Sequence, residues 1–126
     1  MMPAFKEPRG LPRLERIFEL WMLWETDDLP GGCPFVAAAS DYDDRAGPVR
    51  DRVVKYLDQM MEALQRAAGM AIDEGHFRGD IDPRAYAFDV WGVILAYAQW
   101  ARLLEVKDAA DLARAALKRL NAGAAP

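Results

Sequence analysis

The sequence is poor in side chains that perform chemistry. It contains one cysteine, Cys33, and one histidine, His76, in 126 residues. A single cysteine excludes an intrachain disulfide and fits a reducing compartment, so we expect a cytoplasmic protein. The two residues lie in different predicted loops and no short ligand-spacing motif joins them, so we expect no metal, no cofactor and no enzyme activity. Cys33 is expected to pack beside Pro34, and His76 to lie in a solvated loop at a helix end.

Long apolar runs and an excess of positive charge are also missing. The longest uncharged run is Val90–Ala101, about twelve residues, whereas a membrane span needs about 20. The first residues show no basic region followed by an apolar stretch, which excludes a signal peptide. Lys plus Arg number 16 against 20 Asp plus Glu, a net charge of -4. This balance argues against nucleic-acid binding through a basic face, and the shortness of the longest apolar run argues against a membrane partner.

No segment alternates apolar and polar residues over the length of a strand, and the apolar spacing is helical instead. Proline and glycine clusters separate the helical segments. We therefore predict an all-α chain with a single helical domain, containing about four long helices and one short one. The long helices are expected at 11–27, 48–74, 82–105 and 108–120, and the short one at 34–40.

Several residues predict where the helices begin and end. Asp82 and Asp108 are candidate N-caps, and Gly75 is a candidate C′ residue because glycine takes the left-handed conformation freely. The last helix is expected to stop at 121–123. Gly69 lies inside the third long segment, where a close helix crossing would explain it.

The sequence also predicts the environment of two short segments, 34–40 and 41–44. The short segment 34–40 is rich in alanine and is expected to be buried. The acidic run 41–44 lacks the ligand spacing of a calcium loop, so we expect a surface turn that caps the following helix.

The fourth long segment is apolar on every face between Val90 and Ala101. A helix in a monomer of this size would leave one side exposed to water. We therefore expect a partner to cover it.

Aromatic and methionine side chains recur on the long segments. Such side chains are typical of pockets for apolar or aromatic ligands. Ordinary core packing is the alternative, since aromatics at helical spacing mostly pack together. The candidate pocket residues, chosen because they lie mid-helix on segments expected to face one another, are Trp21, Trp24, Tyr56, Met60 and Trp91.

Four short motifs, in their order and spacing, carry a resemblance to a known family. They are Gly31-Gly32-Cys33-Pro34-Phe35, Gly47-Pro48-Val49-Arg50-Asp51, Glu74-Gly75-His76-Phe77-Arg78 and Asp80-Ile81-Asp82-Pro83. The chain resembles the C-terminal domain of TetR-family transcriptional regulators over nearly its whole length. The resemblance implies that residues 1–10 are a clipped N-terminal segment, 11–121 the regulatory domain and 122–126 a flexible tail.

The resemblance also implies a function and partners. Domains of this family bind a small ligand in a helical cavity and form a homodimer in which the last two helices build a four-helix interface. The residues expected at that interface are Trp91, Ile94, Leu95, Ala98, Leu112, Ala116 and Leu120. The family's helix-turn-helix domain has no counterpart here, so we expect this chain alone not to bind DNA. The alternative is a stand-alone helical dimer that binds a small apolar ligand or another regulator.

Overall fold

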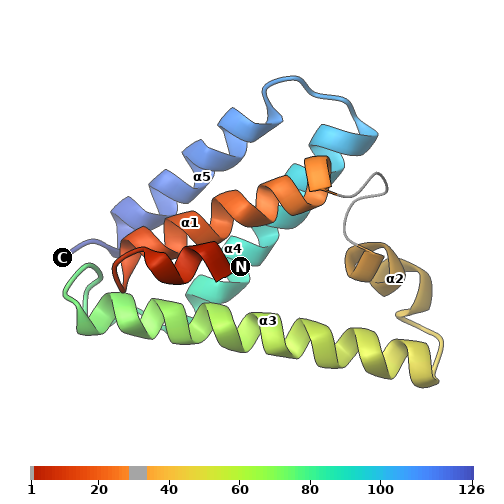
Figure 1. Ribbon diagram of the computed structural model, residues 1–126, viewed down its shortest axis with the longest axis horizontal. Helices are drawn as coiled ribbons and strands as arrows, with labels where there is room; N and C mark the ends of the chain where they lie inside the picture. Colours follow the sequence, from red (N-terminus) through yellow and green to blue (C-terminus); the bar gives the residue numbers. More distant parts are fainter. Residues whose placement is uncertain (1, 29–33) are drawn as a thin grey trace.

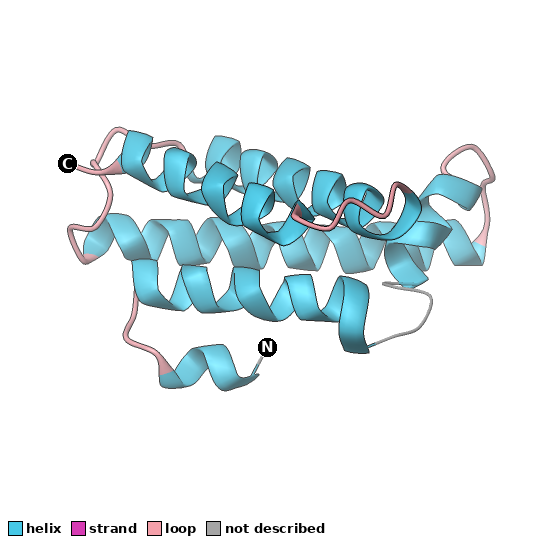
Figure 2. Cartoon of the chain, turned by 90° about the horizontal axis from the view of Figure 1, so that it is seen from above, coloured by secondary structure: helices cyan, strands magenta, loops and turns pink. Residues whose placement is uncertain are grey.

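The computed structural model describes residues 2–28 and 34–126, and within those ranges every regular element is helical (Figures 1 and 2). The prediction of an all-α chain is therefore confirmed. A short 3₁₀ turn at Met2–Lys6 precedes the first α-helix, and one π-helical turn follows each of α1 and α4, at Trp24–Asp28 and Gln99–Leu103. The helices are α1 Leu11–Leu23, α2 Pro34–Tyr42, α3 Pro48–Asp73, α4 Pro83–Ala98 and α5 Ala109–Ala124.

The core forms where α1, α3 and α5 pack around α4 (Figure 1). Helix α4 is apolar nearly all round because it contacts all three of the other long helices. Its inner side includes Tyr86, Val90 and Ile94, which are at most 3% exposed. Each such side chain contributes about 1.5–3 kcal/mol by leaving water. On α3 the buried positions include Ala67, Ala68 and Ala71, whose small side chains allow α4 to approach closely.

The N-terminal half of α3 extends beyond this core, where α2 packs against it (Figure 1). Val49 and Val54 on that half are consequently 48% and 39% exposed. The expectation that the short helix is buried is wrong for its alanines, since Ala37 is exposed and Ala38 and Ala39 are half-buried. The side chains of residues 35 and 36 lie outside the described residues.

The helix ends agree only partly with the predicted caps. Asp82 accepts a hydrogen bond from the backbone N–H of Arg84 at 2.9 Å, and Gly75 adopts a φ of 77°, so both predictions are confirmed. Asp108 stands at the N-cap of α5 but its side chain makes no capping hydrogen bond. Helix α3 starts after Gly47, so the prediction that a residue of the acidic run 41–44 caps it is wrong.

Two other expectations about the helices are corrected by the tertiary structure. A Cβ added at Gly69 would meet no atom within 4 Å, so no close crossing explains this glycine within the described chain. The last helix does not stop at 121–123 but continues to Ala124, which is 3% exposed. Arg78 stabilises the C-terminal end of α5. Its backbone N–H donates to the Ala124 carbonyl at 2.8 Å, and its Nη1 donates to the Gly123 carbonyl at 2.6 Å.

Candidate functional site

Two of the aromatic candidates, Trp21 and Trp91, come together at the contact between α1 and α4. The rings of Trp21 and Trp91 lie 5.1 Å apart with an interplanar angle of 46°, and Trp21 is only 1% exposed. Met60 on α3 is half-buried and packs against the same core, while Tyr56 is half-buried one turn earlier. Trp24 is 36% exposed. None of these five residues lines the grooves described below, which were found within residues 2–28 and 34–126.

Polar side chains gather at the end of the bundle where α1 and α4 pass into their π-helical turns. The Thr26 hydroxyl lies 3.2 Å from the Tyr97 hydroxyl and donates to the Met22 carbonyl at 3.1 Å. Glu25, on the same turn as Thr26, is 1% exposed. Single π turns inside helices are frequent at functional sites. This end of the α1–α4 contact therefore combines aromatic side chains with polar groups, the two kinds of residue that ligand sites use.

The sequence also contains a signal for the burial of Glu25. The buried stripe of α1 runs through Leu14, Phe18 and Trp21 at helical spacing, and Glu25 is the next position of that stripe. A carboxylate that continues an apolar stripe is unusual, because charged side chains are rarely fully buried.

A shallow apolar groove of about 450 Å³ runs along the outer side of α4 and α5. Gly92, Ala96 and Trp100 line it from α4 and its π turn, and Leu112 and Ala116 line it from α5. Trp100 and Leu112 are each 46% exposed. The small residues among them, Gly92, Ala96 and Ala116, would allow another helix to approach closely.

Of the residues expected at a dimer interface, Leu112 and Ala116 line this groove. Ile94 and Ala98 are 0% and 8% exposed and belong to the core of the chain itself. Those two side chains expose almost no surface in the single chain. The exposed face of α4 lies instead along Gly92 and Ala96. The remaining candidates are half-buried, namely Trp91, Leu95 and Leu120.

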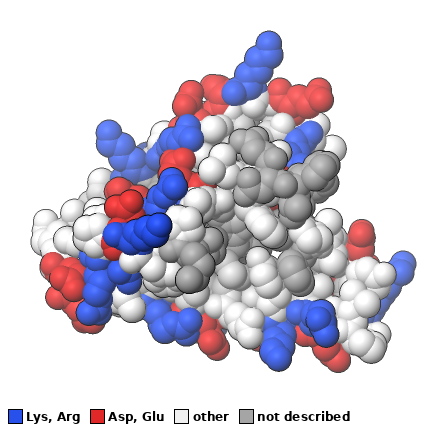
Figure 3. Space-filling view, in the orientation of Figure 1, with Lys and Arg blue, Asp and Glu red and all other residues white. Residues whose placement is uncertain are grey.

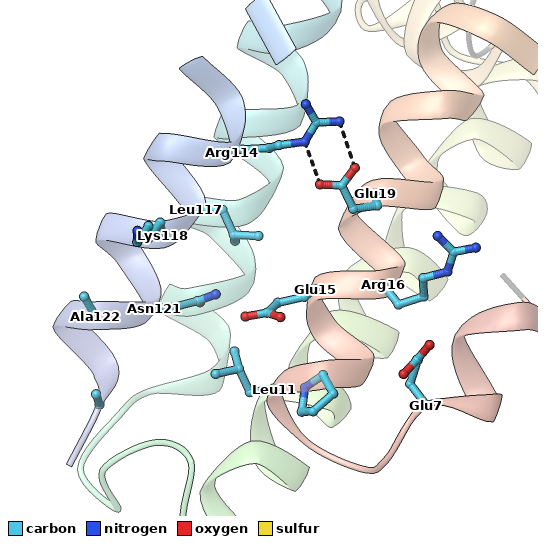
Figure 4. Close-up of a pocket in the computed structure, with 12 residues that line it drawn as sticks. Glu7, Leu11, Glu15, Arg16, Glu19, Arg114, Leu117, Lys118, Asn121 and Ala122 are labelled. Carbon is cyan, nitrogen blue, oxygen red and sulfur yellow. Dashed lines mark hydrogen bonds and ion pairs between the residues drawn. The ribbon is translucent and has the colours of Figure 1, made fainter. Parts of the chain in front are cut away.

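A second, larger groove of about 730 Å³ lies between α1 and α5 (Figure 4). Arg114 closes one side by donating to both carboxylate oxygens of Glu19, from Nε at 2.8 Å and from Nη2 at 3.0 Å. The hydrogen bonds that Arg114 donates to Glu19 raise the pKa of Arg114. This exposed pair links α1 to α5, and its contribution to the free energy of unfolding is at most about 1 kcal/mol.

Tyr86 joins α4 to the same part of α5. Its hydroxyl donates to Asn121 Oδ1 at 2.7 Å, and its side chain is 3% exposed. Burial, and to a smaller degree the charge of Glu15, raises the pKa of Tyr86 well above its usual value. The polar contacts beside the groove between α1 and α5 therefore link helices of the chain to one another, and their role is mainly structural.

The two remaining candidates from the sequence are His76 and Cys33. His76 is half-buried rather than solvated, and its Nδ1 accepts the backbone N–H of Leu11 at 3.0 Å. Cys33 lies outside the described residues. Among the residues that the structure does describe, no three His, Cys, Asp or Glu side chains gather as a metal site, and no helix has the length and apolar character to cross a bilayer.

The visible charges do not form a nucleic-acid surface. On the face shown in Figure 3, the basic and acidic side chains that can be seen stand next to one another. Mixed charge of this kind is typical of a solvated helical surface and offers phosphates no continuous track on that face.

A comparison with protein families decides the classification. The model of the tetracyclin repressor-like C-terminal domain matches residues 10–117, most of the chain. The chain belongs to this family. Membership makes it a regulatory domain of a TetR-like transcriptional regulator, of the kind that binds ligands and dimerises, and the match begins at Gly10, directly before α1. No curated protein matches the chain at a significant level.

Proposed function

We propose that this TetR-like domain senses a small apolar or aromatic ligand as a homodimer and thereby controls a transcriptional repressor. The observation that carries the proposal is the exposed apolar groove of α4 and α5, which faces away from the core of the chain. A second copy of the same chain is the occupant that we assign to it.

The composition of this face supports a helical partner. Leu112 and Trp100 present large exposed apolar side chains to the groove, and Gly92 and Ala96 are small residues that also line it. In a two-fold dimer the same patch is used by both subunits, so α4 and α5 of each chain would form a four-helix interface. Burial of these side chains would remove apolar surface from water on both subunits at once.

Ligand sensing is supported by the aromatic contact between α1 and α4. Helix α4 carries Trp91 toward Trp21 on one side and Ala96 toward the groove on the other. A ligand that separates or tightens α1 and α4 would therefore move a helix of the dimer interface. Binding would then favour one arrangement of the two subunits, which is how a ligand shifts a population.

Sedimentation velocity at micromolar concentration tests the dimer directly. We expect the wild-type chain to sediment as a dimer and Ala96→Glu to sediment as a monomer with unchanged helical content, because the new carboxylate would lie in an apolar interface. Ala37→Glu is the matched control, since Ala37 is exposed on α2 and the same change there should leave the dimer intact. A monomeric wild-type chain, or a dimeric Ala96→Glu variant, would contradict the proposed interface.

The chain alone is expected not to bind DNA, since its net charge is -4. Fluorescence anisotropy with a labelled duplex of random sequence, at low salt, should show no change up to tens of micromolar protein. Salt-sensitive binding in that range would require a basic surface that we do not assign.

A further inference from the structure

The groove of α4 and α5 carries one charged residue of each sign. Asp89 lines it from α4 and Arg119 lines it from α5, and both residues are exposed. Among the residues that the structure describes, neither forms an ion pair or a hydrogen bond, with the other or with a third residue. The face therefore presents two charges of opposite sign that have no partner in their own chain.

These two charges lie at one end of the groove. Helices α4 and α5 run antiparallel and are joined by the residues that follow the π turn of α4 (Figure 1). Asp89 and Arg119 also line a smaller groove of about 360 Å³ between the start of α4 and the end of α5, away from that connection. Toward the connection the groove is lined by Trp100 and Leu112, which are each 46% exposed. The groove therefore has a charged end and an apolar end.

A second copy of the chain can cover the groove in two ways. With the two-fold axis across the helices, the charged end of one subunit would lie on Trp100 and Leu112 of the other. Each charge would then lose water without gaining a partner, which is unfavourable. With the axis along the helices, α4 of one subunit lies beside α5 of the other and like ends meet. Asp89 and Arg119 are then opposite each other on both sides of the axis, and the apolar ends cover each other.

We propose that Asp89 of each subunit forms an ion pair with Arg119 of the partner subunit, and that these two pairs select a second copy of this chain as the occupant of the groove. A helical surface without the complementary charges would leave Asp89 and Arg119 unpaired, and a like charge opposite either of them would repel it. The apolar residues supply the attraction and the ion pairs supply the specificity. The ion pairs rest on the homodimer proposed above and add the basis of its choice of partner.

Charge reversal in one position at a time tests the pairing. Asp89→Arg and Arg119→Asp each place like charges opposite each other twice in a homodimer, so we expect each variant to dimerise at least tenfold more weakly than the wild type. A mixture of the two variants restores opposite charges at both positions, so we expect a one-to-one heterodimer about as stable as the wild-type dimer. Sedimentation velocity measures the dissociation constants, and native mass spectrometry identifies the heterodimer. Pairing within one chain cannot explain this rescue, because each variant chain carries like charges at the two positions.

Asp58→Arg is the matched control. Asp58 is exposed on α3 and lines none of the grooves described above, so the same change in charge there should leave the dimer as stable as in the wild type. Circular dichroism should show the same helical content in every variant, because all three positions are exposed.

The wild-type chain provides a test that requires no substitution. Salt screens exposed ion pairs, so the dissociation constant of the dimer should rise at least threefold between about 0.05 M and about 0.5 M sodium chloride. A dissociation constant that stays constant or falls would contradict the ion pairs, since an interface held by apolar surface alone is not weakened by screening.

The possible failures are distinguishable. A wild-type chain that remains monomeric overturns the homodimer and the ion pairs with it. If the wild type is dimeric but the two variants dimerise as tightly, or their mixture forms no heterodimer, the ion pairs are wrong and the homodimer stands.

Discussion

Gly10 and His76 meet at the corner where the N-terminal segment enters α1. A Cβ added to Gly10 would lie much closer to His76 Nδ1, the atom that accepts the backbone N–H of Leu11, than the sum of the two van der Waals radii. Gly10 also has a φ of 96°, a backbone conformation that residues with a side chain rarely adopt. The start of α1 and the loop after α3 are therefore fitted to each other through a glycine and a histidine that lie far apart in the sequence.

Gly10→Ala is expected to destabilise the domain. The positive φ alone costs about 1–3 kcal/mol for a residue with a Cβ, and the contact with His76 adds to it. Urea unfolding should show a lower midpoint. Gly79→Ala is the control, because a Cβ there would meet nothing within 4 Å, and it should change stability by less than about 0.5 kcal/mol.

His76 itself gives a second test of the same corner. His76→Ala leaves the Leu11 N–H without its acceptor and should cost about 1–3 kcal/mol. His76→Asn places an amide oxygen near the position of Nδ1 and should recover part of that loss in urea unfolding. Equal stability of the two variants would show that the hydrogen bond contributes nothing.

Gly69→Ala is expected to stabilise the domain by about 1 kcal/mol, because alanine favours a helix interior and a Cβ at this position has open space. Thermal and urea unfolding measure the change. A loss of stability instead would reveal that a partner packs against this side of α3.

Arg78→Ala is expected to loosen the end of α5. The guanidinium donates to the Gly123 and Ala125 carbonyls and places positive charge at the negative end of the helix dipole. Because Arg78 is partly exposed, we expect a loss of only about 1 kcal/mol. Hydrogen exchange of the amides in 120–124 should become faster. The exposed Arg84→Ala serves as control, and the idea fails if both variants exchange alike.

Tyr86 makes stability depend on pH in the alkaline range. Its pKa in the folded chain lies above the value of about 10 for an unfolded tyrosine. Folding therefore favours the protonated phenol, and the stability it provides is complete below pH 10 and is lost as pH rises further. The loss for one group reaches about 1.4 kcal/mol per pH unit.

Tyr86→Phe should remove this slope while costing about 1 kcal/mol at neutral pH through the lost hydrogen bond to Asn121. Urea unfolding at pH 8 and pH 11 measures both effects, with Tyr42→Phe as control. If the slope persists in Tyr86→Phe, another group is responsible for the alkaline loss.

The sequence predicted the features that depend on short-range chemistry. Apolar spacing of three and four residues identified the long helices, and Asp82 and Gly75 marked two of their ends correctly. These features depend on backbone preferences and on neighbours within one turn. The motif order also sufficed to identify the family.

Tertiary contacts decided the rest. Helix α5 continues past Asn121 because Arg78, from another part of the chain, satisfies its last carbonyls. Which side of α4 stays exposed, Ala96 or Ile94, depends on where α1 and α3 pack, since every side of this helix is apolar. The burial of Glu25 follows from the same packing. The sequence by itself determined which helices form and which family they belong to, and only their packing determined which side chains face the core and which stay exposed.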